Sequence, residues 1–229
     1  MNYSLKRQND IVCQYFIGDF ILNRVTEMKD LGVHFTYNLN FSLHVSKIAS
    51  KARQMLGFIN RVTSDFTDPK TLYILYNSYV RSRLEFCSQV WNPSSATSIA
   101  KLERVQKRFL RTMSYKSRVM HTNFCYEELC VRFNVKTLQS RRNISDLVFL
   151  NKLFNNRINS PYLTSQVSLR VPRRILRDKP TFSTDCRLLC RKDTFFPRVL
   201  SLSNSLHQYD NLVMCNPIEF KRRISDHFI

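Results

Sequence analysis

The chain has 229 residues and carries 36 lysine and arginine side chains against 17 acidic ones, a formal net charge of +19. A hydrophobic fraction of 43% is enough to form a core, which excludes a disordered tail, and the strongly basic balance favours a polyanionic partner such as nucleic acid. The chain contains only three glycines, which argues against a glycine-rich phosphate loop and against the many tight turns of a β-sandwich.

The positive charge is concentrated in the middle of the chain. Residues 1–40 hold four basic and four acidic side chains, whereas residues 41–157 hold 20 basic against seven acidic ones. We expect a mainly α-helical protein in four parts: a β hairpin and strand over 1–40, a helical bundle over 41–122, further helices over 123–158, and an irregular basic segment interrupted by prolines over 159–229.

Cysteines and hydrophobic runs bear on the cellular compartment. Seven cysteines form an odd set, which favours free thiols in a reducing compartment over a disulfide framework. No charged-then-apolar leader opens the chain, and no apolar run of about 18 residues is present that could span a bilayer. We expect an intracellular protein of the nucleus or cytoplasm without a membrane partner, and adsorption to anionic lipid is the weaker alternative.

Short β-rich runs open the chain. The segment 11–25 has two such runs around Gly18 and Asp19, a pair that supports a tight turn, and is predicted to be a hairpin. Leu31 and Val33 then alternate with other residues as in a half-buried strand. A sheet of this size is only marginally stable by itself. We therefore expect either the helices or a missing N-terminal segment to cover it.

The first predicted helix follows residue 40, with Asn38 or Asn40 able to cap it. Gly57 interrupts this helix and is interpreted as a close backbone crossing. Lys47 and Lys51 share the side opposite an apolar stripe formed by Val45, Ile48, Ala49, Ala52, Met55, Leu56, Ile59 and Val62.

The clearest pattern, from Asp68 to Met113, predicts two amphipathic helices that pack antiparallel. Asp68 can cap the first helix and Pro69 suits its first position. Asn92 and Pro93 end it. Its apolar stripe is Leu72, Leu75, Tyr76, Tyr79, Val80, Leu84, Cys87 and Trp91.

The second of these helices has an apolar face and a cationic face. Ser94, Ser95 or Thr97 can cap it, and Glu103 is the one carboxylate among its cations. Its apolar stripe is Ile99, Leu102, Val105, Phe109, Leu110 and Met113, and its cations are Lys101, Arg104, Lys107, Arg108 and Arg111. Such faces are usually only solvated surface, and phosphate binding is the functional alternative.

A polar stretch over 114–122 is predicted to be a loop that orders on a partner. Within it, Tyr115 beside Lys116 and Arg118 is a candidate base-stacking residue, whereas Tyr76 and Tyr79 are assigned to the core. Helices are predicted over 126–133 and 136–157, the second carrying Arg141 and Arg142, and prolines 161, 172, 180, 197 and 217 are expected to prevent long elements thereafter.

Catalytic and metal-binding patterns are weak. The cysteines and histidine at 121, 125, 130, 186 and 190 have separations that fit structural zinc poorly, so ordinary buried thiols are preferred. The histidines stand in no hydrolase motif, and the nearest carboxylate pairs, 65 with 68 and 127 with 128, do not form a two-metal set. We therefore expect no catalytic residue, no metal and no cofactor.

Several segments in order resemble one family. KDLGVHFTYNLNFSLHV, LYNSYVRSRLEFCSQVWNP, LERVQKRFLR and LQSRRNISDLVFLNKL are similar to the region after the catalytic palm in reverse transcriptases of non-LTR (LINE-like, jockey-type) retrotransposons. This resemblance implies a palm end and primer-grip-like strand at Lys29, Asp30, Leu31, Gly32 and Val33, followed by a thumb-like bundle that holds a template and primer duplex.

The resemblance also implies what the chain lacks. The paired aspartates of the family's polymerase motif lie upstream of the LGV strand, and no adjacent aspartates occur in the 30 residues that precede it here. Mg²⁺ would be bound by that absent palm, so this chain is expected not to polymerise DNA on its own. The resemblance identifies it as a truncated or decayed element or an incomplete gene model.

The resemblance and the charge pattern together predict a non-catalytic binder of RNA or DNA duplexes. Its candidate contact residues are Lys47, Lys51, Lys101, Arg104, Lys107, Arg108, Arg111, Tyr115, Lys116 and Arg118. Two alternatives stay open: a helical scaffold whose basic faces meet acidic protein partners, and a decayed element without a selected function.

Overall fold

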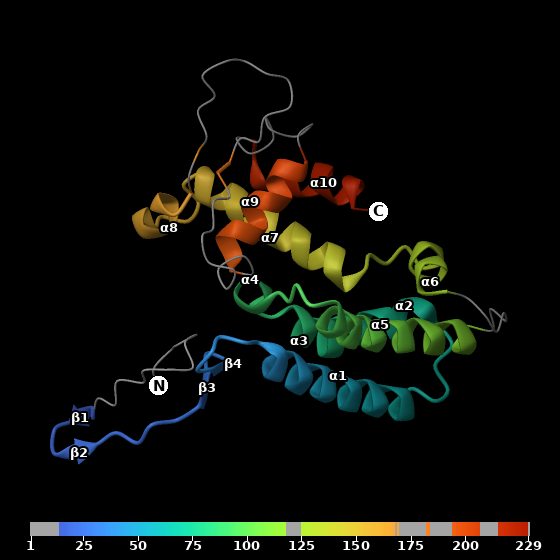
Figure 1. The fold of residues 1–229 in the computed structure, drawn as a ribbon. Helices are drawn as coiled ribbons and strands as arrows, with labels where there is room; N and C mark the ends of the chain where they lie inside the picture. Colours follow the sequence, from blue (N-terminus) through green and yellow to red (C-terminus); the bar gives the residue numbers. More distant parts are fainter. Residues whose placement is uncertain are drawn as a thin grey trace.

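The computed structural model describes residues 14–117, 125–167, 169, 182–183, 194–206 and 215–228. This part of the protein is mainly α-helical, with two small antiparallel hairpins near its N-terminus (Figure 1). The predicted fold class is therefore confirmed.

Each of the two hairpins is a separate two-stranded sheet. Strands β1 (Phe16–Ile17) and β2 (Phe20–Ile21) form the predicted first hairpin, whose apolar residues are all exposed. It projects away from the described helices, which do not cover it (Figure 1). The prediction of a strand from Leu31 is only partly correct, because Leu31 and Gly32 form the turn of a second hairpin, in which β3 (Glu27–Asp30) pairs with β4 (Val33–Thr36).

Helix α1 (Ser42–Val62) is capped by neither of the two predicted residues, Asn38 and Asn40. Its N-cap is Phe41, which offers no side-chain acceptor, and Asn40 Oδ1 instead accepts the N–H of Ser42 at 2.9 Å. The interpretation of Gly57 as a close crossing is wrong, because a Cβ atom there would meet none of the described residues within 4 Å.

The predicted helix from Asp68 to Trp91 is broken into shorter pieces. The side chain of Asp68 caps α2 (Pro69–Tyr76) as predicted, and a π-helical turn η1 (Asn77–Arg81) continues into α3 (Ser82–Glu85). Cys87 then adopts a left-handed backbone, φ 51°, before α4 (Ser88–Trp91). The wide π turn places Val80 against the core and leaves Tyr79 52% exposed, so the core assignment of Tyr79 is wrong.

Helix α5 (Ala96–Lys116) completes a three-helix arrangement. It runs parallel to α1 and antiparallel to the α2–α3 segment (Figure 1). Ser95 is its N-cap residue but makes no side-chain cap bond. The predicted stripe is buried here, apart from half-buried Ile99, and Phe109 stacks on Tyr76 with ring centroids 4.0 Å apart.

The second half of the chain forms another hydrophobic cluster. Short helix α6 (Tyr126–Arg132) leads to α7 (Leu138–Phe154), and α8 (Pro161–Ser165), α9 (Phe195–Ser205) and α10 (Pro217–His227) follow. Helix α7 contributes Leu138 to the first core and three residues to the second, where they pack with α9 and α10 (Figure 1).

The described parts of the segment 159–229 are more regular than expected. Helices α9 and α10 each span 11 residues, although a proline stands in both. Pro197 and Pro217 lie in the first turn of their helices, where the missing N–H group has no intrahelical partner to lose. These two prolines are therefore accommodated in the first turn and do not prevent the helices.

Candidate nucleic-acid interface

One stripe of α5 is cationic along its whole length. Lys101, Arg104, Arg108, Arg111 and Tyr115 follow one another at three- and four-residue spacing, which places them on one side of the helix. All five side chains are exposed, and Tyr115 is 86% exposed. The structure therefore brings four of the five predicted cations of this helix together with the predicted stacking residue.

A second stripe on α1 lies beside the first. Ser46, Arg53 and Arg61 follow at seven- and eight-residue spacing, and both arginines are exposed. The Nζ of Lys101 donates to Ser46 Oγ at 3.2 Å, which places the starts of the two stripes together. The exposed residues of these two adjacent stripes, Arg53, Arg61, Lys101, Arg104, Arg108, Arg111 and Tyr115, are here called the α1–α5 face.

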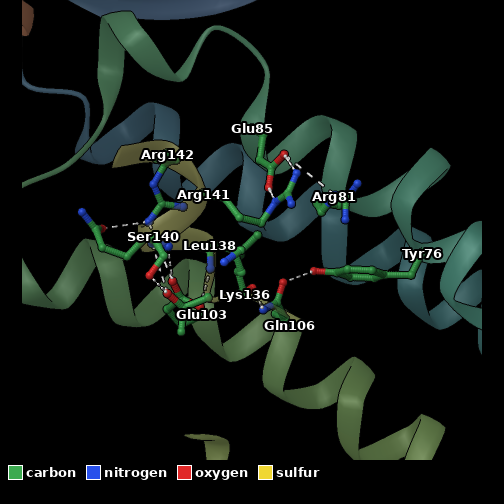
Figure 2. A network of polar contacts seen from close by, with 12 residues as sticks. Tyr76, Arg81, Glu85, Glu103, Gln106, Lys136, Leu138, Ser140, Arg141 and Arg142 are labelled. Carbon is green, nitrogen blue, oxygen red and sulfur yellow. Dashed lines mark hydrogen bonds and ion pairs between the residues drawn. The ribbon is translucent and has the colours of Figure 1, made fainter. Parts of the chain in front are cut away.

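Neither α1 nor α5 places an acidic side chain on the α1–α5 face. Helix α1 contains no Asp or Glu, and the one carboxylate of α5, Glu103, turns inward (Figure 2). It accepts the backbone N–H groups of Leu138 and Gln139 at 3.2 and 2.7 Å and the hydroxyl of Tyr126. Glu103 therefore satisfies the N-terminus of α7 and leaves the cations of α5 uncompensated on their own side.

Three predicted contact residues of this region do not join the α1–α5 face. Lys107 lies on the flank toward α6, where its charge helps to lower the pKa of Glu127 after the stronger effect of hydrogen bonds. Lys116 donates to the carbonyl and, at 3.0 Å, to the hydroxyl of Thr63, so it caps the end of α1. Arg118 lies outside the described residues.

Lys47 and Lys51 lie on the other flank of α1, beside the β3–β4 hairpin. There they line a pocket of about 170 Å³ together with Lys29, Arg83 and Gly32. Lys47 also pairs with Glu27 at 3.4 Å, a partly exposed ion pair that contributes little to stability. The predicted cations are therefore divided between two surfaces.

The primer-grip-like residues do not act as one surface. Lys29 and Gly32 line the pocket, whereas Val33 is 3% exposed and belongs to the core. Leu31 stands at the tip of the turn, 87% exposed, and Asp30 is exposed on β3. These five residues cross the turn between β3 and β4, so their side chains lie in different surroundings.

Arg53, Arg61 and Arg83 belong to these surfaces although the pattern analysis did not select them. The two residues of α1 could have been found from their eight-residue separation, which repeats a helix face after about two turns. Arg83 could not have been found from the sequence, because it reaches the pocket only through the packing of α3 against α1.

Buried polar contacts hold α5 and α7 in place behind the α1–α5 face. Gln106 accepts from Tyr76 Oη at 3.0 Å (Figure 2), and it donates to Tyr126 Oη at 2.9 Å. Arg142, which is fully buried, donates to Asn92 Oδ1 at 3.0 Å, and burial lowers the pKa of its guanidinium. These contacts fix the direction of α5 relative to the second core.

A second buried carboxylate extends this network to α9. Asp146 Oδ2 accepts from Asn92 Nδ2 at 3.0 Å and from Arg198 Nε at 3.1 Å. Burial raises the pKa of Asp146, although both partners oppose that shift. The turn between α4 and α5 is therefore tied to two helices of the second core.

The described ranges hold no group of three His, Cys, Asp or Glu side chains that could bind a metal. Cys125 caps α6 through its Sγ, and Cys130 is buried, while residues 121, 186 and 190 lie outside the described ranges. Cys87, Cys125, Cys130 and Cys215 are all free thiols. Among the helices that the structure describes, none has the length and apolar character needed to cross a membrane.

Comparisons with known proteins identify one relative without a described function. An uncharacterized protein of Caenorhabditis elegans is 27% identical over 146 residues, which cover 62% of this chain and 68% of that protein. No protein-family model matches the chain. No solved structure matches it either.

Proposed function

We propose that this protein binds double-stranded RNA or an RNA/DNA hybrid through backbone phosphates on the α1–α5 face, without catalysing a reaction on its own. The observation that carries the proposal is the composition of this face: six cations, on two adjacent helices whose one carboxylate points into the interior. Solubility alone does not require so unbalanced a surface, whereas phosphate contacts do.

The form of the face supports a duplex as the ligand. The two helices are parallel, 21 residues each, and joined near both ends by Lys101 with Ser46 and Lys116 with Thr63. Rows of cations on rigid neighbouring helices suit the regular phosphate rows of a duplex and do not read bases, so we expect weak sequence preference. The resemblance of these segments to a reverse transcriptase thumb also supports this assignment.

Fluorescence anisotropy with a labelled 20-base-pair RNA/DNA hybrid tests the proposal. In the triple variant Arg104→Gln, Arg108→Gln and Arg111→Gln, we expect affinity to fall at least tenfold at 100 mM salt, by a similar factor for unrelated sequences. The slope of log K against log salt should become shallower by about two to three, because each lost phosphate contact removes roughly 0.9.

A matched control removes three exposed charges elsewhere. Lys70→Gln, Lys221→Gln and Arg222→Gln change the net charge equally but lie on α2 and α10. This control should keep most of the affinity and the salt slope. Equal losses in both triple variants would show that only net charge matters, and unchanged binding by the α5 variant would overturn the proposal and leave an acidic protein partner as the alternative.

A further inference from the structure

The pocket between α1, α3 and the β3–β4 hairpin is cationic on several sides. Lys29 comes from the hairpin, Lys47 and Lys51 from α1, and Arg83 from α3. The other lining residues are Gly32, His34, His44, Ile48 and Phe86. Four cations from three elements therefore line a pocket of about 170 Å³, a volume equal to roughly six water molecules at ~30 Å³ each.

Two histidines in the wall of this pocket add polar groups. His44 is 2% exposed, and its Nδ1 accepts the backbone N–H of His34 at 3.2 Å. The neutral ring therefore carries its proton on Nε2, and this atom has no hydrogen-bond partner among the described residues. A buried donor without an acceptor is uncommon in folded proteins.

The cations of the pocket also affect the neighbouring side chain of His34. The pKa of His34 is lowered first by burial and then by the charges of Lys47, Lys29 and Lys51, while Glu27 acts in the opposite direction. Glu27 is the carboxylate paired with Lys47, and both of these side chains are partly exposed. A dianion in the pocket would meet three further cations, Lys29, Lys51 and Arg83, and would compete with Glu27 for Lys47.

We propose that this pocket is a binding site for a phosphate group, separate from the α1–α5 face and independent of the function proposed for that face. Arg83 offers a planar fork suited to two phosphate oxygens, and the three lysines supply point charges around the others. The group can belong to a small free phosphate compound or to the phosphorylated end of a nucleic-acid strand. A pocket of this volume fits one such group and not a duplex.

Isothermal titration of the full chain with inorganic pyrophosphate tests the site, using the double variant Lys51→Gln with Arg83→Gln. We expect millimolar or tighter binding by the wild-type chain and a loss of about tenfold or more in the variant, because charge-assisted hydrogen bonds are lost. Lys70→Gln with Lys221→Gln is the matched control and should bind as the wild type does. No binding at 10 mM pyrophosphate, or an equal loss in the control, would overturn the proposal.

Two short single strands that differ only in a 5′-phosphate separate the two sources. Tighter binding of the phosphorylated strand, lost in the pocket variant, assigns the site to strand ends, and equal binding of the two strands assigns it to small phosphates. The triple variant of α5 should keep pyrophosphate binding, so failure of one proposal leaves the other measurable. If the pocket variant unfolds, acetylation of the wild-type chain replaces the titration. Pyrophosphate should then protect Lys29, Lys47 and Lys51 from acetylation but leave Lys70 unprotected. Equal acetylation of all four lysines would contradict the site.

Discussion

The carboxylate of Glu103 accepts the backbone N–H of Gln139 at 2.7 Å and thereby joins the middle of α5 to the first turn of α7. The negative charge of Glu103 interacts with the N-terminus of α7 and with the guanidinium of Arg142. Because Glu103→Gln removes this charge, we expect the free energy of unfolding to fall by about 2 kcal/mol. Urea denaturation measures this loss, and the exposed substitution Glu127→Gln should change stability by less than about 0.5 kcal/mol.

Duplex binding by the Glu103→Gln variant provides an independent check of the α1–α5 face. Because the carboxylate points away from that face, its removal should leave the affinity within about twofold, well below the effect of losing one phosphate contact. A large gain in affinity would show that Glu103 compensates the cations in solution and would contradict the orientation described here.

Arg141 and Arg142 are neighbours in sequence but should respond differently to substitution. Arg142→Met leaves Asn92 and Gln139 without a buried donor, and we expect it to cost about 3 kcal/mol. Arg141→Met breaks a partly exposed pair with Glu85 and should cost about 1 kcal/mol. Chemical denaturation of the two variants measures the difference, and equal effects would contradict the buried role of Arg142.

The pH dependence of stability should contain a contribution from His44. Burial lowers the pKa of His44 to about 4 from its ordinary value of 6.5, so the unfolded chain binds a proton at a higher pH than the folded chain does. The stabilisation is fully present above pH 6.5 and is lost as the pH falls through this window toward 4.

Thermal and urea unfolding at pH 7 and pH 5 test this contribution. We expect His44 to account for a decrease of about 1–2 kcal/mol between these two pH values. The variant His44→Gln keeps an acceptor for the N–H of His34 but does not titrate, so its stability should fall by correspondingly less over the same range. An identical pH dependence in both proteins would show that the histidine is not buried as described.

The helices with regular apolar spacing could be predicted from the sequence, because burial of one stripe decides their structure. The stripe of α5 and the cap at Asp68 are cases in which local chemistry and packing agree. Even the inward direction of Glu103 had a signal, since it lies three and seven residues before the buried Gln106 and Leu110.

Other features depend on neighbours distant in the chain. The break at Phe86 and Cys87 frees a carbonyl of Phe86, and the indole N–H of Trp91 donates to it at 2.8 Å, a compensation that the apolar spacing did not reveal. The roles of Lys116 and Lys47 were missed for the same reason, because each depends on an oxygen supplied by another element. Charge pattern alone identified cations but not their neighbours.

Two glycines that look alike in the sequence should respond in opposite directions to alanine. Gly32 has a φ of +89°, and a Cβ there would lie 3.1 Å from the ring of Phe86, so Gly32→Ala should destabilise the protein by about 1–2 kcal/mol. Gly57 lies inside α1 with nothing described within 4 Å of such a Cβ, so Gly57→Ala should stabilise by about 0.5–1 kcal/mol. Thermal melts of both variants measure this difference in stability. Because Gly32 also lines the proposed phosphate pocket, Gly32→Ala should lose pyrophosphate affinity, whereas Gly57→Ala should keep it. Destabilisation by Gly57→Ala would instead restore the close backbone crossing that the described packing contradicts.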